Sequence, residues 1–419
     1  MRYQILRIAS EEKVHNHLWE LFQAKVIAGV LKNLDEEDEQ LHFNQLLEGQ
    51  SFKVTEKVAP RLYHIFQEVI ETLEFEDSID LYIGSDPQIN AVTIPSLNKQ
   101  YPHKIIIYSA LLERFTREEL KFVLGHEIGH IINNTAVLNR IIQFIMSRHD
   151  VLPLALELKV NLWDQLSELN ADRYGLLAVK DLKTCLGAFF KLVAGIRPDL
   201  IELDYDEYIA MIDQIFSSFK EKFLANSSQF SHPFVPIRIK MLTTLANSKL
   251  FREFIKSGKL KKDTALEKQS QEIIELLFQY GNSEIEHLFK VMIITGGILM
   301  ASLDNEITRD EILCIMSNLT GLELFPENLI PALLESPQQD VADQFSQAVT
   351  QIITKHPQER YRVIEYLCHV AFSDQLIRQN EINFIMTVGK KLLKFTQREL
   401  YELISANIHT HFRPALFKF

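Results

Sequence analysis

The stretch from Thr116 to Asn134 constrains the fold of this chain more than any other. Its sequence, TREELKFVLGHEIGHIINN, starts with Thr116 and has Glu119 three residues later, a pair typical of the capping box that begins a helix. The apolar residues that follow recur at helical spacing. They are Leu120, Val123, Leu124, Ile128, Ile131 and Ile132. We therefore expect one helix over residues 117–133, packed against the rest of its domain.

Two histidines and a glutamate lie in the middle of this predicted helix. His126 and His130 are four residues apart, so their imidazoles share one face and can bind one metal ion, while Glu127 projects nearby. This His-Glu-x-x-His pattern is typical of zinc peptidases. Such a short match also arises by chance, and a buried histidine often only hydrogen-bonds within a core. The position of the motif, in mid-helix among apolar residues, favours a metal site in the wall of a cleft.

A catalytic zinc ion usually has three protein ligands and one water, so the motif needs a third ligand. The longer motif His-Glu-x-x-His-x-x-Gly-x-x-His, which supplies a third histidine, is excluded. It needs Gly at position 133 and His at position 136, where this chain has Asn and Ala. Glu168 is the best candidate, on a helix predicted from about residue 155 to residue 179. Asp172 lies one turn later on the same face and could accept a hydrogen bond from a ligating histidine.

Three alternatives to this choice stay open. Glu157 lies on the same predicted helix, with Asn161 one turn later. His149 lies beside Asp150 in a predicted loop. Glu168 could also be an ordinary carboxylate on a solvated helix surface.

The sequence before the capped helix predicts a small sheet. Residues 1–75 are helical by pattern, and three β-type runs separated by turn signals follow within residues 78–109. The runs are Ile79–Ile83, Ala91–Ile94 and Lys104–Tyr108. We expect one edge strand at the rim of the cleft, where it can hold an extended peptide by main-chain hydrogen bonds.

The basic stretch Lys256–Lys262, KSGKLKK, ends a run of predicted helices, and we place a domain boundary there. Residues 1–260 would form the first domain, and residues 270–419 an all-α second domain. The second domain contains a faint repeat in which an Asp is followed seven residues later by a Glu, as two related helical hairpins would produce. The two pairs are Asp304 with Glu311 and Asp374 with Glu381.

Composition and charge limit the class of protein. The chain has 419 residues, 47% hydrophobic and 24% charged, which is ordinary for a globular protein of two or three domains. A formal net charge of −12 argues against nucleic acid as a partner, because phosphate binding needs clustered Lys and Arg. Three widely spaced cysteines in apolar helical runs favour core residues in a reducing compartment.

No segment for export or membrane crossing is expected. The first residues lack the basic start, apolar core and cleavage site of a signal peptide. The longest uncharged apolar run, Val291–Leu303, is too short to cross a bilayer as a helix. We therefore expect a cytoplasmic protein without a transmembrane segment.

These motifs resemble the HtpX-like and CAAX-prenyl-protease-like zinc metallopeptidases, a branch of the gluzincins. The resemblance covers about residues 55–250. It rests on Asn90-Ala91 before a strand, the motif from His126 to His130, Glu168 with Asp172, and His232-Pro233 with Arg238. Membrane-embedded members of the family carry transmembrane helices around the catalytic domain. This chain therefore resembles the soluble subgroup, which leaves peripheral membrane contact open.

The resemblance implies a zincin-type fold, α+β and mainly α-helical, with one catalytic zinc ion. The zinc ligands would be His126, His130 and Glu168. Glu127 would be the general base and acid, and Asp172 would orient a ligand histidine.

Four further roles are implied by the resemblance alone. His232 and Arg238 would line the cleft and stabilise the oxyanion or the substrate, and Asn90 and Ala91 would bind substrate. The alternative for His232 is an ordinary turn histidine before a proline.

The second domain more weakly resembles the helical tellurite-resistance-B-like domain. The residues that match its pattern are Asp304, Glu311, Asp374 and Glu381. The resemblance implies metal binding or contact with a regulatory protein partner for these acids. The alternative is that they cap helices and face solvent.

These observations predict a zinc-dependent endopeptidase that acts on proteins or peptides. A role in protein quality control is expected, with the cleft covered by the second domain or by residues 180–231 until a signal arrives. The alternative is a non-catalytic scaffold that acts through partner contacts of the second domain.

Overall fold

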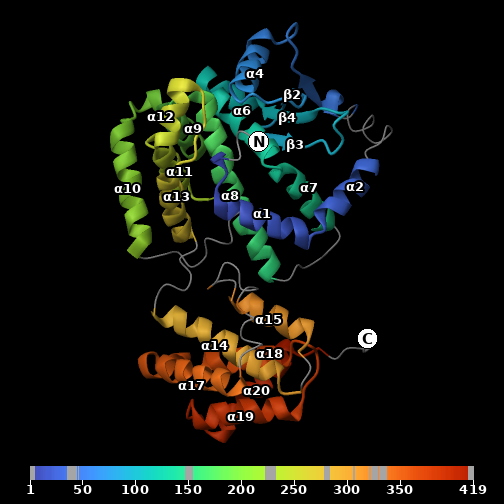
Figure 1. Ribbon diagram of the computed structural model, residues 1–419, viewed down its shortest axis with the longest axis vertical. Helices are drawn as coiled ribbons and strands as arrows, with labels where there is room; N and C mark the ends of the chain where they lie inside the picture. The colour runs from blue at the N-terminus through green and yellow to red at the C-terminus, as the bar shows by residue number, and fades with distance from the viewer. Residues whose placement is uncertain are drawn as a thin grey trace. The chain divides into compact units, whose positions relative to one another are not determined.

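Figure 1 shows the computed structural model of the chain, which describes residues 5–34, 45, 47–146, 154–221, 233–277, 284–304, 307–319, 322, 329 and 337–413. Two compact units are present, one of residues 1–151 with 160–277 and one of residues 152–159 with 278–419. The fold is α+β and mainly α-helical, as predicted. The helices of the first unit are α1 Ala9–Leu21, α2 Ala24–Leu34, α4 Pro60–Thr72, α5 Ser109–Arg114, α6 Arg117–Ile132, α7 Thr135–Met146, α8 Leu154–Val179 from residue 160 onwards, α9 Leu182–Ala194, η2 Pro198–Leu200, α10 Tyr205–Glu221, α11 Val235–Ala246, α12 Lys249–Ser257 and α13 Thr264–Leu277.

The first unit extends beyond the predicted end at residue 260. Helix α13 packs against α11 and places Leu266 in the core of the unit. Ser270 on this helix accepts a hydrogen bond of 2.6 Å from Nη2 of the buried Arg173. The basic stretch that suggested a boundary covers the end of α12 and the loop to α13.

A four-stranded sheet lies beside α6 in the order β1-β2-β4-β3. Its strands are β1 Ser51–Lys53, β2 Ile79–Gly84, β3 Ala91–Ile94 and β4 His103–Tyr108. The three predicted strands are present, whereas β1 falls in a region predicted as helical. Its three residues pair antiparallel with β2. Strand β3 pairs antiparallel with β4 and is the last strand of the sheet, next to α6. It is therefore the predicted edge strand.

The predicted start of α6 is confirmed. Oγ1 of Thr116 accepts from the backbone N of Glu119, and the Glu119 carboxylate accepts from the backbone N of Thr116. Nζ of Lys191 donates to the same carboxylate at 2.5 Å. The helix ends at Ile132, and Asn134 has a φ of 57°, which turns the chain into α7.

Glycines allow α6 and α8 to cross at close range. A Cβ atom added to Gly125 would lie 2.6 Å from Cβ of Ala178, and one added to Gly129 would lie 2.9 Å from the ring of Tyr174. A Cβ atom on Gly175 of α8 would lie 2.6 Å from a ring atom on α6. Real Cβ atoms do not approach so closely, so these positions fix the distance between the two helices.

We predict that Gly125→Ala destabilises the first unit. The added methyl group would overlap Ala178, and overpacking of this kind costs roughly 1–3 kcal/mol. The melting temperature should fall by roughly 2–10 °C in calorimetry. Gly29→Ala is the matched control, because a Cβ atom on this exposed α2 glycine meets no atom within 4 Å. A Gly125→Ala protein that melts at or above the wild-type temperature would contradict this packing.

A buried polar network holds α1 against the middle of α8. Glu11 is fully buried and accepts from Nε of Arg7 at 2.6 Å, Nε1 of Trp163 at 3.0 Å and Nδ2 of Asn170 at 2.7 Å. Oδ1 of Asn170 accepts from the backbone N of Ile8 at 2.8 Å. Burial raises the pKa of Glu11, although the hydrogen bond and charge of Arg7 oppose this. Asn170 lies on the turn of α8 that carries the predicted site, so the network helps to fix that turn.

The described part of the second unit is all α-helical, as predicted. Its helices are α14 Glu284–Ala301, α15 Arg309–Leu319, α17 Gln338–Lys355, η5 Pro357–Glu359, α18 Arg360–Ala371, α19 Gln379–Lys391 and α20 Gln397–His411. The helix pairs α14–α15 and α18–α19 correspond to the two predicted hairpins, and the buried Tyr366 donates to the carbonyl oxygen of Ile293 at 2.6 Å. Across both units, no described helix has the length and apolar character needed to span a membrane.

Candidate metal centre

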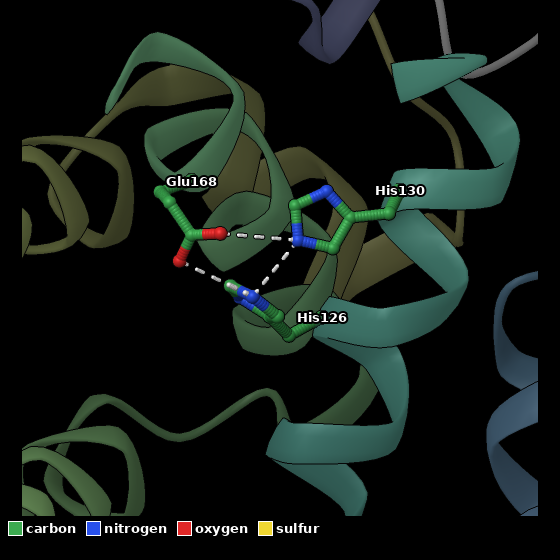
Figure 2. A group of neighbouring side chains, drawn as sticks. All are labelled: His126, His130 and Glu168. Atoms are coloured by element: carbon green, nitrogen blue, oxygen red, sulfur yellow. Dashed lines mark hydrogen bonds and ion pairs between the residues drawn. The ribbon is translucent and has the colours of Figure 1, made fainter. Parts of the chain in front are cut away.

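The side chains of His126 and His130 on α6 and Glu168 on α8 point towards one another, as Figure 2 shows. The Nε2 atoms of the two histidines are 3.1 Å apart. Oε1 of Glu168 is 3.3 Å from Nε2 of His130, and Oε2 is 3.6 Å from Nε2 of His126. Within the described residues, this is the one group of three or more His, Cys, Asp or Glu whose ligand atoms all lie within 4.8 Å.

The hydrogen bonds behind the histidines set their protonation. Nδ1 of His126 is 3.0 Å from Oδ1 of Asp172, and a carboxylate only accepts, so this Nδ1 carries the hydrogen. Nδ1 of His130 is 3.0 Å from Oγ1 of Thr135, which donates its own hydrogen to the carbonyl oxygen of His130 at 3.1 Å. The hydroxyl must therefore accept from Nδ1. Both Nε2 atoms then present lone pairs to the same space, an arrangement that a cation between them would stabilise.

Arg238 on α11 ties the carboxylates of α8 together. Its Nη2 is 2.6 Å from Oδ1 of Asp172 and 3.3 Å from Oε2 of Glu168, and its Nε is 2.8 Å from Oδ2 of Asp172. The guanidinium lies over the ring of Phe189, 4.9 Å from the centroid. Burial would raise the pKa of Asp172, but the charge of Arg238 outweighs it and holds that pKa below its usual value. Asp172 therefore stays ionised as the acceptor for His126.

The group fits a zinc ion. Four ligands about 2.0–2.1 Å from a tetrahedral zinc ion are separated from one another by about 3.3–3.4 Å. The three separations here are 3.1, 3.3 and 3.6 Å. Without a metal, burial would lower the pKa of His130, but the hydrogen bond and charge of Glu168 outweigh it and raise that pKa. The site therefore attracts positive charge, in agreement with its donor set of two imidazoles and one carboxylate.

Glu127 lies next to this group and faces the sheet. Its side chain is buried, with 7% of the residue exposed, and its Oε2 accepts a hydrogen bond of 2.6 Å from Oγ1 of Thr93 on β3. A carboxylate from the residue next to His126 thus contacts the edge strand. This is where a general base would need to lie to act on a peptide held along β3.

The remaining predicted residues of the first unit have varied surroundings. Asn90 is exposed just before β3, and its Oδ1 accepts from the backbone N of Ala91 at 2.9 Å. Ala91 is buried and pairs with Ile107 in the sheet. His232 and the alternative ligand His149 lie outside the described residues, as does the side chain of Glu157.

The glutamates of the repeat in the second unit cap helices. Oε2 of Glu311 accepts from N and Oγ1 of Thr308, at 2.7 and 2.8 Å. Oε2 of Glu381 accepts from the backbone N of Arg378 at 3.0 Å. These hydrogen bonds confirm the part of the alternative reading in which the glutamates cap helices. Both glutamates are only 1% exposed, however, so they do not face solvent. Burial raises the pKa of Glu381 to about 7.

The aspartates of the repeat are bridged by Arg378. Nitrogen atoms of its guanidinium lie 2.9 Å from the carboxylate of Asp304, in the first copy of the repeat, and 2.7 Å from that of Asp374, in the second copy. The four acids do not form a ligand group of the kind found in the first unit, judged on the described residues. Arg378 supplies the positive charge that a metal ion would otherwise provide.

Two threonines in contact with the site were not predicted. Thr135 follows His130 by five residues and is fully buried, and Thr93 lies on the edge strand. A single hydroxyl carries no periodic signal in the sequence. Thr135 had one local cue, since it is the first residue of a helix that starts directly after the Asn133-Asn134 turn.

A sheet lies beside a helix with two histidines, and a glutamate from a second helix completes a group that could hold a metal ion. Comparison with known proteins makes this specific. Residues 56–152 match the model of peptidase family M48, and residues 290–403 match that of the tellurite resistance protein TerB. The chain thus carries an M48 peptidase domain followed by a TerB domain, which confirms both resemblances. The M48 match ends before Glu168, so only the geometry of the group supports Glu168 as a third ligand.

Two relatives illustrate how far the similarity reaches. The plastoglobule-localized metallopeptidase 48, chloroplastic, of Arabidopsis thaliana is 26% identical over 225 residues, which are 51% of this chain and 64% of that protein. The protease HtpX homolog of Streptococcus pyogenes serotype M5 (strain Manfredo) is 36% identical over 81 residues, which are 19% of this chain and 26% of that protein. The chain therefore spans less than two thirds of either relative. No solved structure matches it.

Proposed function

We propose that the first unit is a zinc-dependent endopeptidase whose metal ligands are His126, His130 and Glu168. The observation that carries this proposal is the convergence of three ligand atoms from two helices, within 3.1–3.6 Å of one another, beside the carboxylate of Glu127. The names of the two relatives, a metallopeptidase and a protease, support the same reaction class.

Each residue of the site has a separate task in this proposal. Zinc would supply a Lewis acid that polarises a scissile carbonyl and lowers the pKa of a water. Glu127 takes the proton from the attacking water and delivers it to the leaving amine. Asp172 keeps the Nδ1 proton on His126, so that Nε2 is free to bind.

Arg238 has a different task from the one the family resemblance implied. Its Nε and Nη2 atoms contact Asp172, and Nη2 also contacts Glu168, so we assign it the task of positioning these carboxylates. His232 would then be the residue that stabilises the oxyanion, a role that follows from the resemblance alone.

An extended protein segment is the proposed substrate. Strand β3 is the last strand of the sheet, so a peptide can pair with its outer edge through main-chain hydrogen bonds. Asn90 and Ala91 lie at the start of this strand. Main-chain recognition is tolerant of sequence, which supports action on unfolded proteins and hence a role in quality control in the cytoplasm. We further propose that the TerB unit regulates access, as the attachment of a second folded unit to a peptidase suggests.

The test is cleavage of unfolded casein by the full chain. We expect cleavage that a zinc chelator abolishes and that added zinc restores. Absence of chelator-sensitive cleavage by fully zinc-loaded protein would contradict the proposal. It would favour instead a scaffold that acts through the TerB unit.

A further inference from the structure

Thr93 on β3 contacts the proposed general base from the sheet side. It pairs with Ile105 of β4, and its Oγ1 is 2.6 Å from Oε2 of Glu127. The carbonyl oxygen of Glu127 is also 3.2 Å from this hydroxyl. A hydroxyl has one hydrogen to donate, and the shorter contact to the charged oxygen takes it. The carbonyl lies within α6, where the helix supplies its own donor.

We propose that Thr93 is a positioning residue that fixes the carboxylate of Glu127 for catalysis, an inference that rests on the peptidase function proposed above. With Oε2 held by the hydroxyl, Oε1 is the oxygen left free to take the proton from water. The strand that aligns the substrate main chain therefore also sets the position of the base.

The surroundings of Glu127 explain why such a contact is needed. The carboxylate is largely buried on α6, and its charge interacts with the guanidinium of Arg238. A glutamate side chain on a helix has several accessible rotamers. The hydrogen bond from Thr93 selects the rotamer that faces the edge strand, and it pairs an oxygen that would otherwise be a buried acceptor without a donor.

The kinetic test compares Thr93→Val with Thr93→Ser in the full, zinc-loaded chain. Valine keeps the shape of threonine and removes the donor, so kcat for casein cleavage should fall about 10- to 100-fold, the factor expected for one hydrogen bond to a charged group. KM should change by less than about threefold, because the substrate strand is intact. Serine keeps the hydroxyl and should restore kcat, with zinc content equal in all three proteins.

Thr244→Val is the matched control. Thr244 is a half-buried threonine on α11 whose Oγ1 donates to the carbonyl oxygen of Lys240 at 2.8 Å, away from the site. Its replacement should leave kcat unchanged. A Thr93→Val enzyme with wild-type kcat, or a Thr93→Ser enzyme as slow as Thr93→Val, would overturn the proposed role.

A second measurement does not depend on activity. In the chelated, metal-free chain, Thr93→Val should lower the melting temperature by about 2–6 °C, because a buried carboxylate oxygen loses its donor. In a Glu127→Ala background the same change should have less than half of this effect. Equal shifts in both backgrounds would overturn the contact. A wild-type chain without peptidase activity would instead refute the proposed function, and the thermal cycle would still decide whether Thr93 holds Glu127.

Discussion

Glu127→Gln is expected to abolish casein cleavage while zinc stays bound. Glutamine has almost the same shape and can still accept the hydrogen bond from Thr93, but it cannot take a proton from water. General bases contribute about 10²- to 10⁴-fold to such rates, so kcat should fall by at least about 100-fold. The measurements are kcat and zinc content by elemental mass spectrometry on the same sample.

The control for this variant is Glu118→Gln. Glu118 lies on the same helix, nine residues earlier, and its exposed carboxylate pairs with Lys121 at the surface. This change should leave both kcat and zinc content unaffected. Hydrolysis at the wild-type rate by zinc-loaded Glu127→Gln would show that another group is the base.

Glu168→Ala is expected to release the metal. Two imidazoles would remain, and a chelate of two ligands binds zinc far more weakly than one of three. Loss of a hydrogen-bond partner behind a metal ligand costs about 10- to 100-fold in affinity, so loss of the ligand itself should cost more than that. Asp172→Asn keeps all three proposed ligands and changes only the carboxylate that contacts His126 and Arg238, so it should show the smaller effect. Competition with a chromophoric chelator gives both affinities.

The fold of Glu168→Ala needs a separate check, because Arg238 also contacts this carboxylate at 3.3 Å. Asp172 retains its two hydrogen bonds to Arg238 in the variant, so the far-ultraviolet circular dichroism should match that of the chelated wild type. Wild-type zinc affinity in a folded Glu168→Ala protein would show that the third ligand is not Glu168. Glu157 and His149 would then be tested next.

The helix at the centre of the site was predictable because its signals are local. The capping box of Thr116 and Glu119 and the helical spacing of apolar residues set its bounds to within one residue. The pairing of Glu168 with Asp172 was visible for the same reason, since residues four apart on a helix share a face. The structure brings Glu168 to the histidine pair and Asp172 to His126.

Features that depend on packing between distant segments were not predictable. The guanidinium of Arg238 on α11 contacts Asp172 on α8 although 66 residues of sequence separate them, and no spacing in the sequence indicates this. The hydroxyl of Thr93 meets Glu127 because β3 is placed against α6 by its pairing with β4. Strand β1 was missed because three residues are too few for alternation to be recognised, and its Phe52 is exposed.

The most direct test is a crystal structure of the full chain grown with zinc, with an anomalous difference map at the zinc edge. We expect one strong peak in the first unit, bonded to Nε2 of His126, Nε2 of His130 and an oxygen of Glu168, with Glu127 close to the open position. An ion bound without Glu168, or a folded, zinc-saturated chain with no peak between the two histidines, would contradict a catalytic metal centre at this site.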